Sequence, residues 1–406
     1  MKICMLCYRG NPYSGGQGIY LKYVSEELVR QGHDVHVIVG PPYPPSMNGV
    51  TMHYIHNNEY YVKKGTLIVN KSAPFDIFRP LNAYEFLSTR IGCFSEISAF
   101  SFRAFMLIRR LIERIPFDVI HDNQCLGYGL LLMREFGVPV IATIHHPLTI
   151  DLENAIERAS SFLNKMKGVM FYPILMQQIV SKRLDHIITV SHDSRSRIAA
   201  DFGVPMENQT VVYNGLDTSI FHPIKGIRKR KGKLLFVGNV EDGKKGFVYL
   251  AKALQHVRGD VKLSVVDGGS PHRKVTGELI RKLKLLDRIE LIGKATTEQL
   301  VRHYCESEIA IVPSTYEGFG FPAAEAMACG VPVIASDGGA LPEVVGDAGV
   351  IVPSRDDIAL ADAIDSLMAD RKKRTMLAAQ GKERVIREFN WPKAVGAMVD
   401  VYKSKM

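Results

Sequence analysis

The sequence lacks the cysteine pattern of a disulfide-stabilised or zinc-binding protein. Its six cysteines are scattered along the chain: Cys4, Cys7, Cys93, Cys125, Cys305 and Cys329. Cys4 and Cys7 form a Cys-x-x-Cys, but they lie inside an apolar segment typical of a strand, whereas a redox pair lies in a loop that opens a helix. We therefore predict two buried strand thiols, and no second pair follows at zinc spacing.

Several other features are missing. The longest apolar run, near residues 168–176, is too short to span a bilayer. The absence of a Gly-x-Ser-x-Gly and of a Walker loop disfavours a lipase-like hydrolase and a P-loop NTPase. No Asp-x-Asp occurs to hold a cation against phosphates, so we expect neither a metal nor a cofactor. Met1 leads directly into the first apolar segment, so we expect no signal peptide and a cytoplasmic protein.

The length and charge of the chain narrow its class further. A chain of 406 residues is long enough for two or three domains with separate cores. Its formal net charge of +9 favours anionic ligands or a membrane surface. No compact module of basic and aromatic residues is visible, so we expect no nucleic-acid partner.

Short apolar strands alternate with amphipathic helices along the whole chain. This alternation predicts an open α/β fold with parallel sheets. The pattern starts afresh after a basic segment, residues 221–233, which we interpret as a linker. We therefore predict an N-terminal Rossmann-like domain over 1–220, a second over 234–389, and a last helix from about 390 to 406.

Two segments of the N-terminal domain stand out. Residues 41–116 are rich in Pro, Tyr, Phe and Asn and show no clean period, so we interpret them as an insertion that forms a lid or an acceptor surface. Residues 152–182 are expected to be helical and carry Lys165 and Lys167 among apolar residues. These lysines and the basic linker suit contact with anionic lipid, but we favour the simpler interpretation of a solvated linker and a helix on the domain surface.

The most informative segment runs from residue 309 to residue 330. Ile309–Val312 is apolar on both faces, as expected of a central parallel strand. Two glycines, Gly318 and Gly320, then allow the backbone to approach a ligand, and Pro322 suits the first position of a helix. The amides that open this helix form an anion site. Because two carboxylates flank it, Glu317 and Glu325, the site suits a ligand with both phosphates and hydroxyls.

The spacing of these two glutamates resembles that of the retaining glycosyltransferases of family four. Those enzymes have the GT-B architecture, in which two Rossmann-like domains face each other across a cleft. In them the last helix returns to the first domain. The resemblance extends over nearly the whole chain through further landmarks: Ser14-Gly15-Gly16-Gln17-Gly18, Thr143-Ile144-His145, Asn214-Gly215-Leu216-Asp217, Lys244-Lys245-Gly246 and Asn390-Trp391.

The resemblance implies roles for the residues of this segment. Glu317 would hold hydroxyls of the donor sugar, and Glu325 would accept hydrogen bonds from the ribose hydroxyls. The amides of Gly318, Phe319 and Gly320 would contact the sugar and the diphosphate. A carboxylate can accept from two vicinal hydroxyls at once.

The resemblance also implies a phosphate-binding loop at residues 238–246, after the first strand of the second domain. Lys245 matches a family lysine that neutralises the leaving diphosphate. Asn239 stands where the family has an arginine, so either Lys244 compensates or fewer charges hold the leaving group. Gly293 and Lys294, after a later strand, are further candidates for substrate binding.

In the N-terminal domain the resemblance points to two places. Gly15 and Gly16 lie in a loop that would face the diphosphate and the acceptor. The segment is not a Gly-x-Gly-x-x-Gly, so it does not favour a dinucleotide. His145 follows the strand Val140–Ile144 and would touch the donor sugar and the reacting centre. His146 beside it leaves this assignment open by one residue.

Together these features predict a metal-independent, retaining glycosyltransferase. The donor would be a UDP- or GDP-type nucleotide sugar, and the acceptor a glycan, a lipid-linked sugar or a small molecule in glycan or glycolipid biosynthesis. Two alternatives remain: an epimerase or hydrolase of the same fold, and a non-catalytic adaptor that binds nucleotide sugars or membranes.

Overall fold

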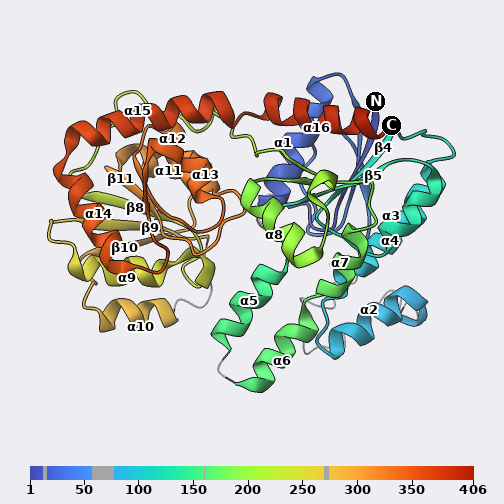
Figure 1. Cartoon of the computed structure of the whole chain (residues 1–406), viewed down its shortest axis with the longest axis horizontal. Coiled ribbons are helices and arrows are strands. Elements are labelled where there is room, and N and C mark those ends of the chain that lie inside the picture. The colour runs from blue at the N-terminus through green and yellow to red at the C-terminus, as the bar shows by residue number, and fades with distance from the viewer. Residues whose placement is uncertain (12–15, 57–76, 160, 269–273) are drawn as a thin grey trace. The chain divides into compact units, whose positions relative to one another are not determined.

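The computed structural model describes residues 1–11, 16–56, 77–159, 161–268 and 274–406. The chain forms two compact units (Figure 1). The first comprises residues 1–190, 194–212 and 395–406, and the second comprises residues 191–193 and 213–394. Residues 221–233 thus belong to the second unit, and the end of the last helix belongs to the first.

The first unit is built on a seven-stranded parallel sheet. Its strand order is β3-β2-β1-β4-β5-β6-β7. The strands are β1 (Lys2–Cys7), β2 (Asp34–Val39), β3 (Thr51–Tyr54), β4 (Val119–Asn123), β5 (Val140–Ile144), β6 (His186–Thr189) and β7 (Gln209–Val211). The helices are α1 (Gly16–Arg30), α2 (Pro80–Arg90), α3 (Glu96–Leu111), α4 (Gly129–Met133), α5 (Thr149–Arg158), α6 (Phe162–Phe171), α7 (Ile174–Ser181), most of α8 (His192–Phe202) and most of α16 (Trp391–Lys405).

The second unit is built on a six-stranded parallel sheet in the order β10-β9-β8-β11-β12-β13. Its strands are β8 (Lys233–Val237), β9 (Lys262–Val266), β10 (Ile289–Gly293), β11 (Ile309–Val312), β12 (Val333–Ser336) and β13 (Val350–Val352). Its helices are α9 (Phe247–His256), α10 (Lys274–Lys282), α11 (Thr297–Glu306), α12 (Phe321–Ala328), α13 (Leu341–Val345), α14 (Asp357–Ala369) and α15 (Arg371–Glu388). The predicted α/β fold with two parallel sheets is confirmed.

The central strands are buried because helices cover both faces of each sheet. All residues of β4, β5 and β11 are buried, which explains their continuous apolar character. Cys4 and Cys7 lie buried in β1 with free thiols, as predicted. Burial raises the pKa of both thiols, to about 12 for Cys7.

The prediction for residues 41–116 is partly wrong. This part of the chain contains β3 and a regular helix, α3, whose buried face includes Phe100, Ala104 and Ile108. These residues belong to the hydrophobic core of the first unit, so α3 is part of the domain rather than of an insertion. Residues 57–76, the centre of the predicted lid, lie outside the described residues.

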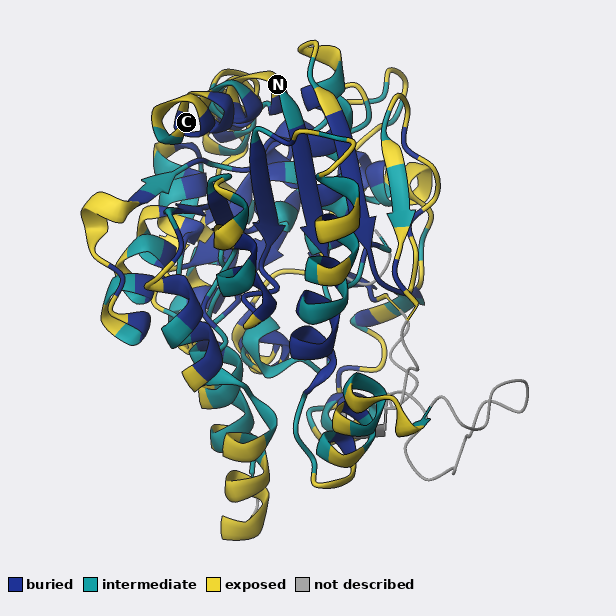
Figure 2. Cartoon of the chain, turned by 90° about the vertical axis from the view of Figure 1, so that its right-hand side faces the viewer, coloured by how far each residue is buried: buried dark blue, intermediate teal, exposed yellow. Residues whose placement is uncertain are grey.

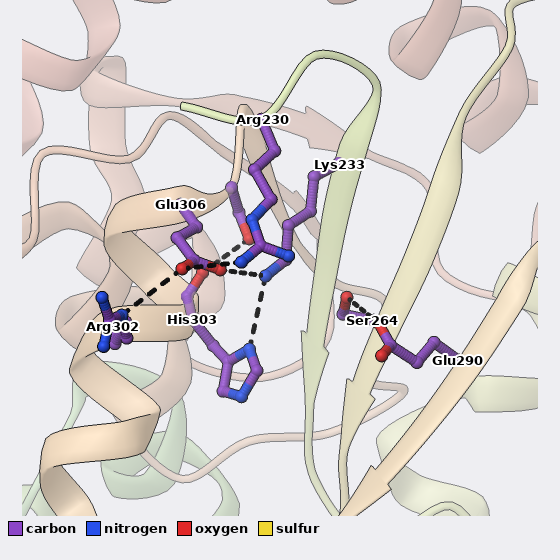
Figure 3. Close-up of polar contacts among 8 residues, drawn as sticks. Arg230, Lys233, Ser264, Glu290, Arg302, His303 and Glu306 are labelled. Carbon is purple, nitrogen blue, oxygen red and sulfur yellow. Dashed lines mark hydrogen bonds and ion pairs between the residues drawn. The ribbon is translucent and has the colours of Figure 1, made fainter. Parts of the chain in front are cut away.

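The predicted linker contributes to the second unit through a buried ion pair (Figure 3). Lys233, 6% exposed, donates to Glu306 Oε2 over 2.9 Å. Arg230 donates to the other oxygen of Glu306 over 3.1 Å. Lys233 therefore faces the interior of the second unit, and the interpretation of the linker as solvated does not hold for this residue.

No helix within the described residues is long and apolar enough to cross a membrane. Residues 152–182 form α5, α6 and α7, so their helical character is confirmed.

Candidate functional site

The strand order of the second unit changes direction between β8 and β11. From β8 the chain continues outward to β9 and β10, whereas β11 is followed on the other side by β12 and β13. In open parallel sheets the crevice at such a point, at the carboxyl ends of the strands, binds ligands. The loops that leave β8 and β11 carry the motifs singled out in the sequence, residues 238–246 and 313–320.

These two loops touch backbone to backbone. Gly246 has a φ of 67°, and a Cβ atom at this position would lie 1.9 Å from the carbonyl oxygen of Pro313. The amide of Thr315 donates to the carbonyl of Lys244 over 2.7 Å. Only glycine satisfies both the left-handed backbone and the close approach, so Gly246 holds the two loops together.

Lys245 and Glu317 meet where the two loops join. The ammonium of Lys245 donates to Glu317 Oε1 over 2.7 Å, and the Ser314 hydroxyl donates to the same oxygen over 2.8 Å. Glu317 is only 9% exposed. Its second oxygen, Oε2, has no protein partner among the described residues, so it remains able to accept a hydrogen bond from a ligand.

The helix α12 begins directly after this pair. Gly320 is its N-cap residue, with a φ of 101°, and the helix starts at Phe321. Pro322 is therefore the second helical residue rather than the predicted first. The Phe319 side chain is buried against Phe321 and Phe389, with ring centroids 5.2 and 5.3 Å away. Only the backbone of Phe319 thus remains to contact a ligand.

Glu325 is the fifth residue of α12 and therefore lies beyond its first turn. The Tyr304 hydroxyl donates to Glu325 Oε2 over 2.8 Å. Burial raises the pKa of Glu325 to about 7, although the Tyr304 hydrogen bond and the charge of Lys245 act in the opposite direction. The carboxyl is thus poised to change charge near neutral pH.

The remaining candidates of the second unit lie farther from this pair. Asn239 is exposed, and its Oδ1 accepts from the amide of Glu241 over 2.9 Å, so it stabilises its own loop. Lys244 contributes its backbone to the junction of the loops. Gly293 is the last residue of β10 and Lys294 follows it, two strands away from β8 in the sheet.

The strand order of the first unit changes direction between β1 and β4, and His145 follows β5, the next strand after β4. The Asn123 amide nitrogen donates to the Gln17 carbonyl over 3.0 Å, which turns Asn123 Oδ1 toward His145 Nε2, 2.8 Å away. Because Oδ1 can only accept, Nε2 carries the proton and Nδ1 is left as an acceptor. Burial lowers the pKa of His145 to about 3, so the ring is neutral.

A second contact, with an aromatic side chain, also fixes the ring of His145. The ring of Tyr20 packs edge-on against it, with centroids 4.7 Å apart. The Tyr20 hydroxyl bonds Thr143 Oγ1 over 2.9 Å, and the same oxygen bonds His121, which in turn bonds Tyr402 of α16. His146 instead contacts Asp151 of α5 over 3.0 Å. Of the two histidine side chains, only that of His145 thus contacts Asn123, at the end of β4.

The predicted glycine loop of the first unit is only partly described. Gly15 lies outside the described residues, and Gly16 is the exposed first residue of α1. Sequence reasoning missed the side chains that orient the predicted residues: Ser314, Tyr304, Asn123 and Gln124, whose Oε1 accepts from the His145 amide over 2.6 Å. Ser314 was close enough to Glu317 to be noticed, whereas the other three are brought in from distant segments by the fold.

Comparison with known proteins decides the family. Residues 217–384 match the model described as glycosyl transferases group 1, and residues 14–220 match the one described as glycosyltransferase family 4. The chain belongs to this glycosyltransferase family. An MMP alpha-(1->4)-mannosyltransferase from Mycolicibacterium hassiacum is 34% identical over 409 residues, covering 99% of this chain and 98% of that protein.

Solved structures of glycosyltransferases share the fold. The sucrose-phosphate synthase of Thermosynechococcus elongatus aligns with a TM-score of 0.76 and 22% identity, covering 99% of this chain and 98% of that one. HepE of Anabaena, solved in complex with UDP-glucose, aligns over 100% of both chains with a TM-score of 0.70 and 18% identity. This glycosyltransferase therefore has the GT-B architecture expected from its sequence.

The junction of the loops leads to a prediction about stability. Gly246→Ala should lower the free energy of unfolding by about 3 kcal/mol, because the new methyl group clashes with the Pro313 carbonyl and the backbone is left-handed. The matched control is Gly277→Ala in α10, where a Cβ meets no atom within 4 Å. This control should be stabilising by about 0.5–1 kcal/mol in urea unfolding. Equal stability of the two variants would contradict the close contact.

The raised pKa of Glu325 predicts a pH dependence of stability. Between its ordinary pKa of 4.5 and the folded value of about 7, the unfolded chain ionises while the folded protein keeps the proton. The contribution of the Glu325 carboxyl to the free energy of unfolding is therefore fully present below pH 4.5 and is lost as the pH rises through about 7. In Glu325→Gln, the free energy of unfolding should therefore fall by about 1–3 kcal/mol less over this pH range than in the unmodified protein. Urea unfolding at several pH values measures the difference. If the exposed Glu298→Gln has the same effect, the decline does not arise from Glu325.

Proposed function

We propose that this glycosyltransferase moves a sugar from a nucleoside-diphosphate sugar to an acceptor hydroxyl with retention of the anomeric configuration, in glycan or glycolipid biosynthesis. The observation that carries the proposal is the contact of Lys245, Glu317 and Ser314 at the change of strand order, beside the start of α12. A cation and helix amides stand beside a carboxylate with one unpartnered oxygen. This combination matches a ligand in which phosphates and hydroxyls are adjacent.

Each group has a role in this proposal. Lys245 and the positive end of the α12 dipole stabilise the negative charge that develops on the departing diphosphate. Glu317 Oε2 accepts from hydroxyls of the transferred sugar. Glu325 accepts from the ribose hydroxyls in its ionised form, so the Tyr304 hydroxyl must share the carboxylate with them.

His145 acts in this proposal as a neutral hydrogen-bond acceptor. Its Nε2 proton is held by Asn123, so only Nδ1 is available to a ligand. A ring with a pKa of about 3 does not donate a second proton at neutral pH. We therefore assign His145 to orienting a hydroxyl of the sugar rather than to protonating the leaving group.

The transfer itself needs no nucleophile from the protein. The bond between the anomeric carbon and the phosphate oxygen breaks while the acceptor oxygen forms its bond on the same face. The acceptor proton passes to the departing phosphate oxygen. Lys245 and the helix amides lower the energy of this step by stabilising the phosphate charge.

The names of the relatives indicate which donors should be tested first. Because one relative is named a mannosyltransferase and HepE was solved with UDP-glucose, GDP-mannose and UDP-glucose should be tried first. The acceptor is proposed to be a glycan, a lipid-linked sugar or a small molecule, and the reaction to take place in the cytoplasm.

The proposal is tested by incubating the protein with each donor and a set of candidate acceptors. A new glycoside with the donor's anomeric configuration, read from its proton NMR coupling, supports it. An inverted product would exclude retention. Isomerised donor without transfer would instead indicate an epimerase, donor loss that does not depend on any acceptor would indicate a hydrolase, and tight binding without turnover would indicate an adaptor.

Glu317→Gln provides a residue-level prediction. Turnover should fall by about 100-fold or more, because an amide cannot replace the carboxylate that accepts sugar hydroxyls. The affinity for the free nucleoside diphosphate should be retained or increased, because Lys245 loses its protein partner. Calorimetry with the diphosphate and initial rates with the intact donor separate these effects. As the matched variant, Glu325→Gln should weaken diphosphate binding about tenfold; equal loss in both variants would mean that the roles are misassigned.

Activity should persist in excess chelator. Lys245 and the α12 amides supply the positive charge that a metal ion supplies in other enzymes. Initial rates with and without EDTA measure this. Turnover that stops in EDTA and returns with Mg²⁺ or Mn²⁺ would contradict the prediction.

A further inference from the structure

The helix α6 exposes its apolar side chains to solvent. With about 100° between successive residues, one arc of roughly 120° contains only large apolar residues. These residues are Phe162, Leu163, Met166, Val169 and Met170, all exposed, with 76% and 70% exposure for the first two. We call them the outer stripe of α6. In Figure 2, turned about the vertical axis from Figure 1, the lowest helix is α6, and it is coloured as exposed.

The opposite face of α6 is held by the rest of the first unit. The backbone of Gly168 lies beside α5, since a Cβ there would be 3.7 Å from Leu152 and 3.9 Å from Ala155. Phe171 stacks on Phe94, with ring centroids 5.3 Å apart, and its carbonyl accepts from the Phe94 amide over 3.0 Å. The helix is therefore anchored with its apolar residues pointing outward, the reverse of a helix on an ordinary domain surface.

Two lysines border the outer stripe. At 100° per residue, Lys165 lies beyond Val169 on one side and Lys167 lies beyond Leu163 on the other. Both are exposed, and α6 contains no acidic residue. An apolar stripe between two rows of positive charge is the pattern of a helix that lies in the plane of a membrane interface. Leu175, at the start of α7 and 66% exposed, adds to the apolar surface.

We propose that α6 docks on the surface of an anionic lipid bilayer, with its outer stripe in the headgroup region and its two lysines against lipid phosphates. An exposed apolar surface of this kind marks an interaction site. Positive charge on both borders favours an anionic surface over a second copy of α6, whose lysines would repel these. The buried Lys233 and the paired Arg230 of the linker cannot contribute in the same way. This inference does not depend on the donor chemistry proposed above.

Vesicle co-sedimentation tests the proposal. The whole protein should sediment with phosphatidylglycerol-containing vesicles at low salt, and much less with phosphatidylcholine vesicles or at high salt. Phe162→Ser/Leu163→Ser should weaken this binding by about 100-fold or more. Lys165→Gln/Lys167→Gln should weaken it by about 30-fold, from about 1 kcal/mol for each basic residue near an anionic surface.

Matched variants control for composition and charge. Leu286→Ser removes an apolar side chain that is 65% exposed in the second unit, and Lys372→Gln/Lys373→Gln removes two exposed charges from α15. Both should bind vesicles like the unmodified protein, and circular dichroism establishes that every variant is folded. No binding to anionic vesicles overturns the proposal, and so does equal loss of binding in the controls. Concentration-dependent dimers that Phe162→Ser/Leu163→Ser abolishes, without vesicle binding, would identify a second copy as the occupant instead.

Fluorescence gives an independent readout of insertion. The only native tryptophan, Trp391, is 5% exposed and provides a constant background. Phe162→Trp should show a blue-shifted emission when anionic vesicles are added, because its ring enters the apolar region. Leu286→Trp should show no shift. If the two variants respond alike, α6 does not insert.

Discussion

The close approach of the Gly246 backbone to the Pro313 carbonyl is the contact on which the proposed donor site depends. It brings two loops together that leave neighbouring strands, β8 and β11, at the point where the strand order changes direction. One loop delivers a lysine and the other a glutamate, and their side chains meet over 2.7 Å. A residue with a Cβ at position 246 would separate the loops and with them the two charges.

The first unit uses a different device for the same purpose. Asn123, at the end of β4, holds the start of α1 through its amide nitrogen and His145 through its amide oxygen. The orientation of one amide thus fixes which ring nitrogen of His145 carries the proton. The network from Tyr20 through Thr143 and His121 to Tyr402 lies behind it and joins α1, two strands and the last helix. The predicted site histidine is thus supported by polar groups that are themselves buried.

Much of the fold could be predicted from the sequence, because a strand buried on both faces of a parallel sheet must be a continuous apolar run. Ile309–Val312 was recognised as a central strand for this reason, and it forms β11, which is buried throughout. The helix α3 was missed although Phe100, Ala104 and Ile108 recur at helical spacing, because the irregular composition around them obscured the period. The glutamates and Lys245 were found because their motif is local. Tyr304 and Asn123 were not, because nothing near them in the sequence indicates the side chains that they orient.

The pairing of Lys245 with Glu317 also bears on which anions the proposed site would reject. Inorganic phosphate could gain the lysine only by taking it from Glu317, which would leave a nearly buried carboxylate beside another negative charge. A nucleotide sugar takes the same lysine, but its hydroxyls can donate to the carboxylate that the lysine leaves. The ion pair would thus discriminate in favour of a ligand that brings a replacement partner, in a cell where free phosphate is abundant.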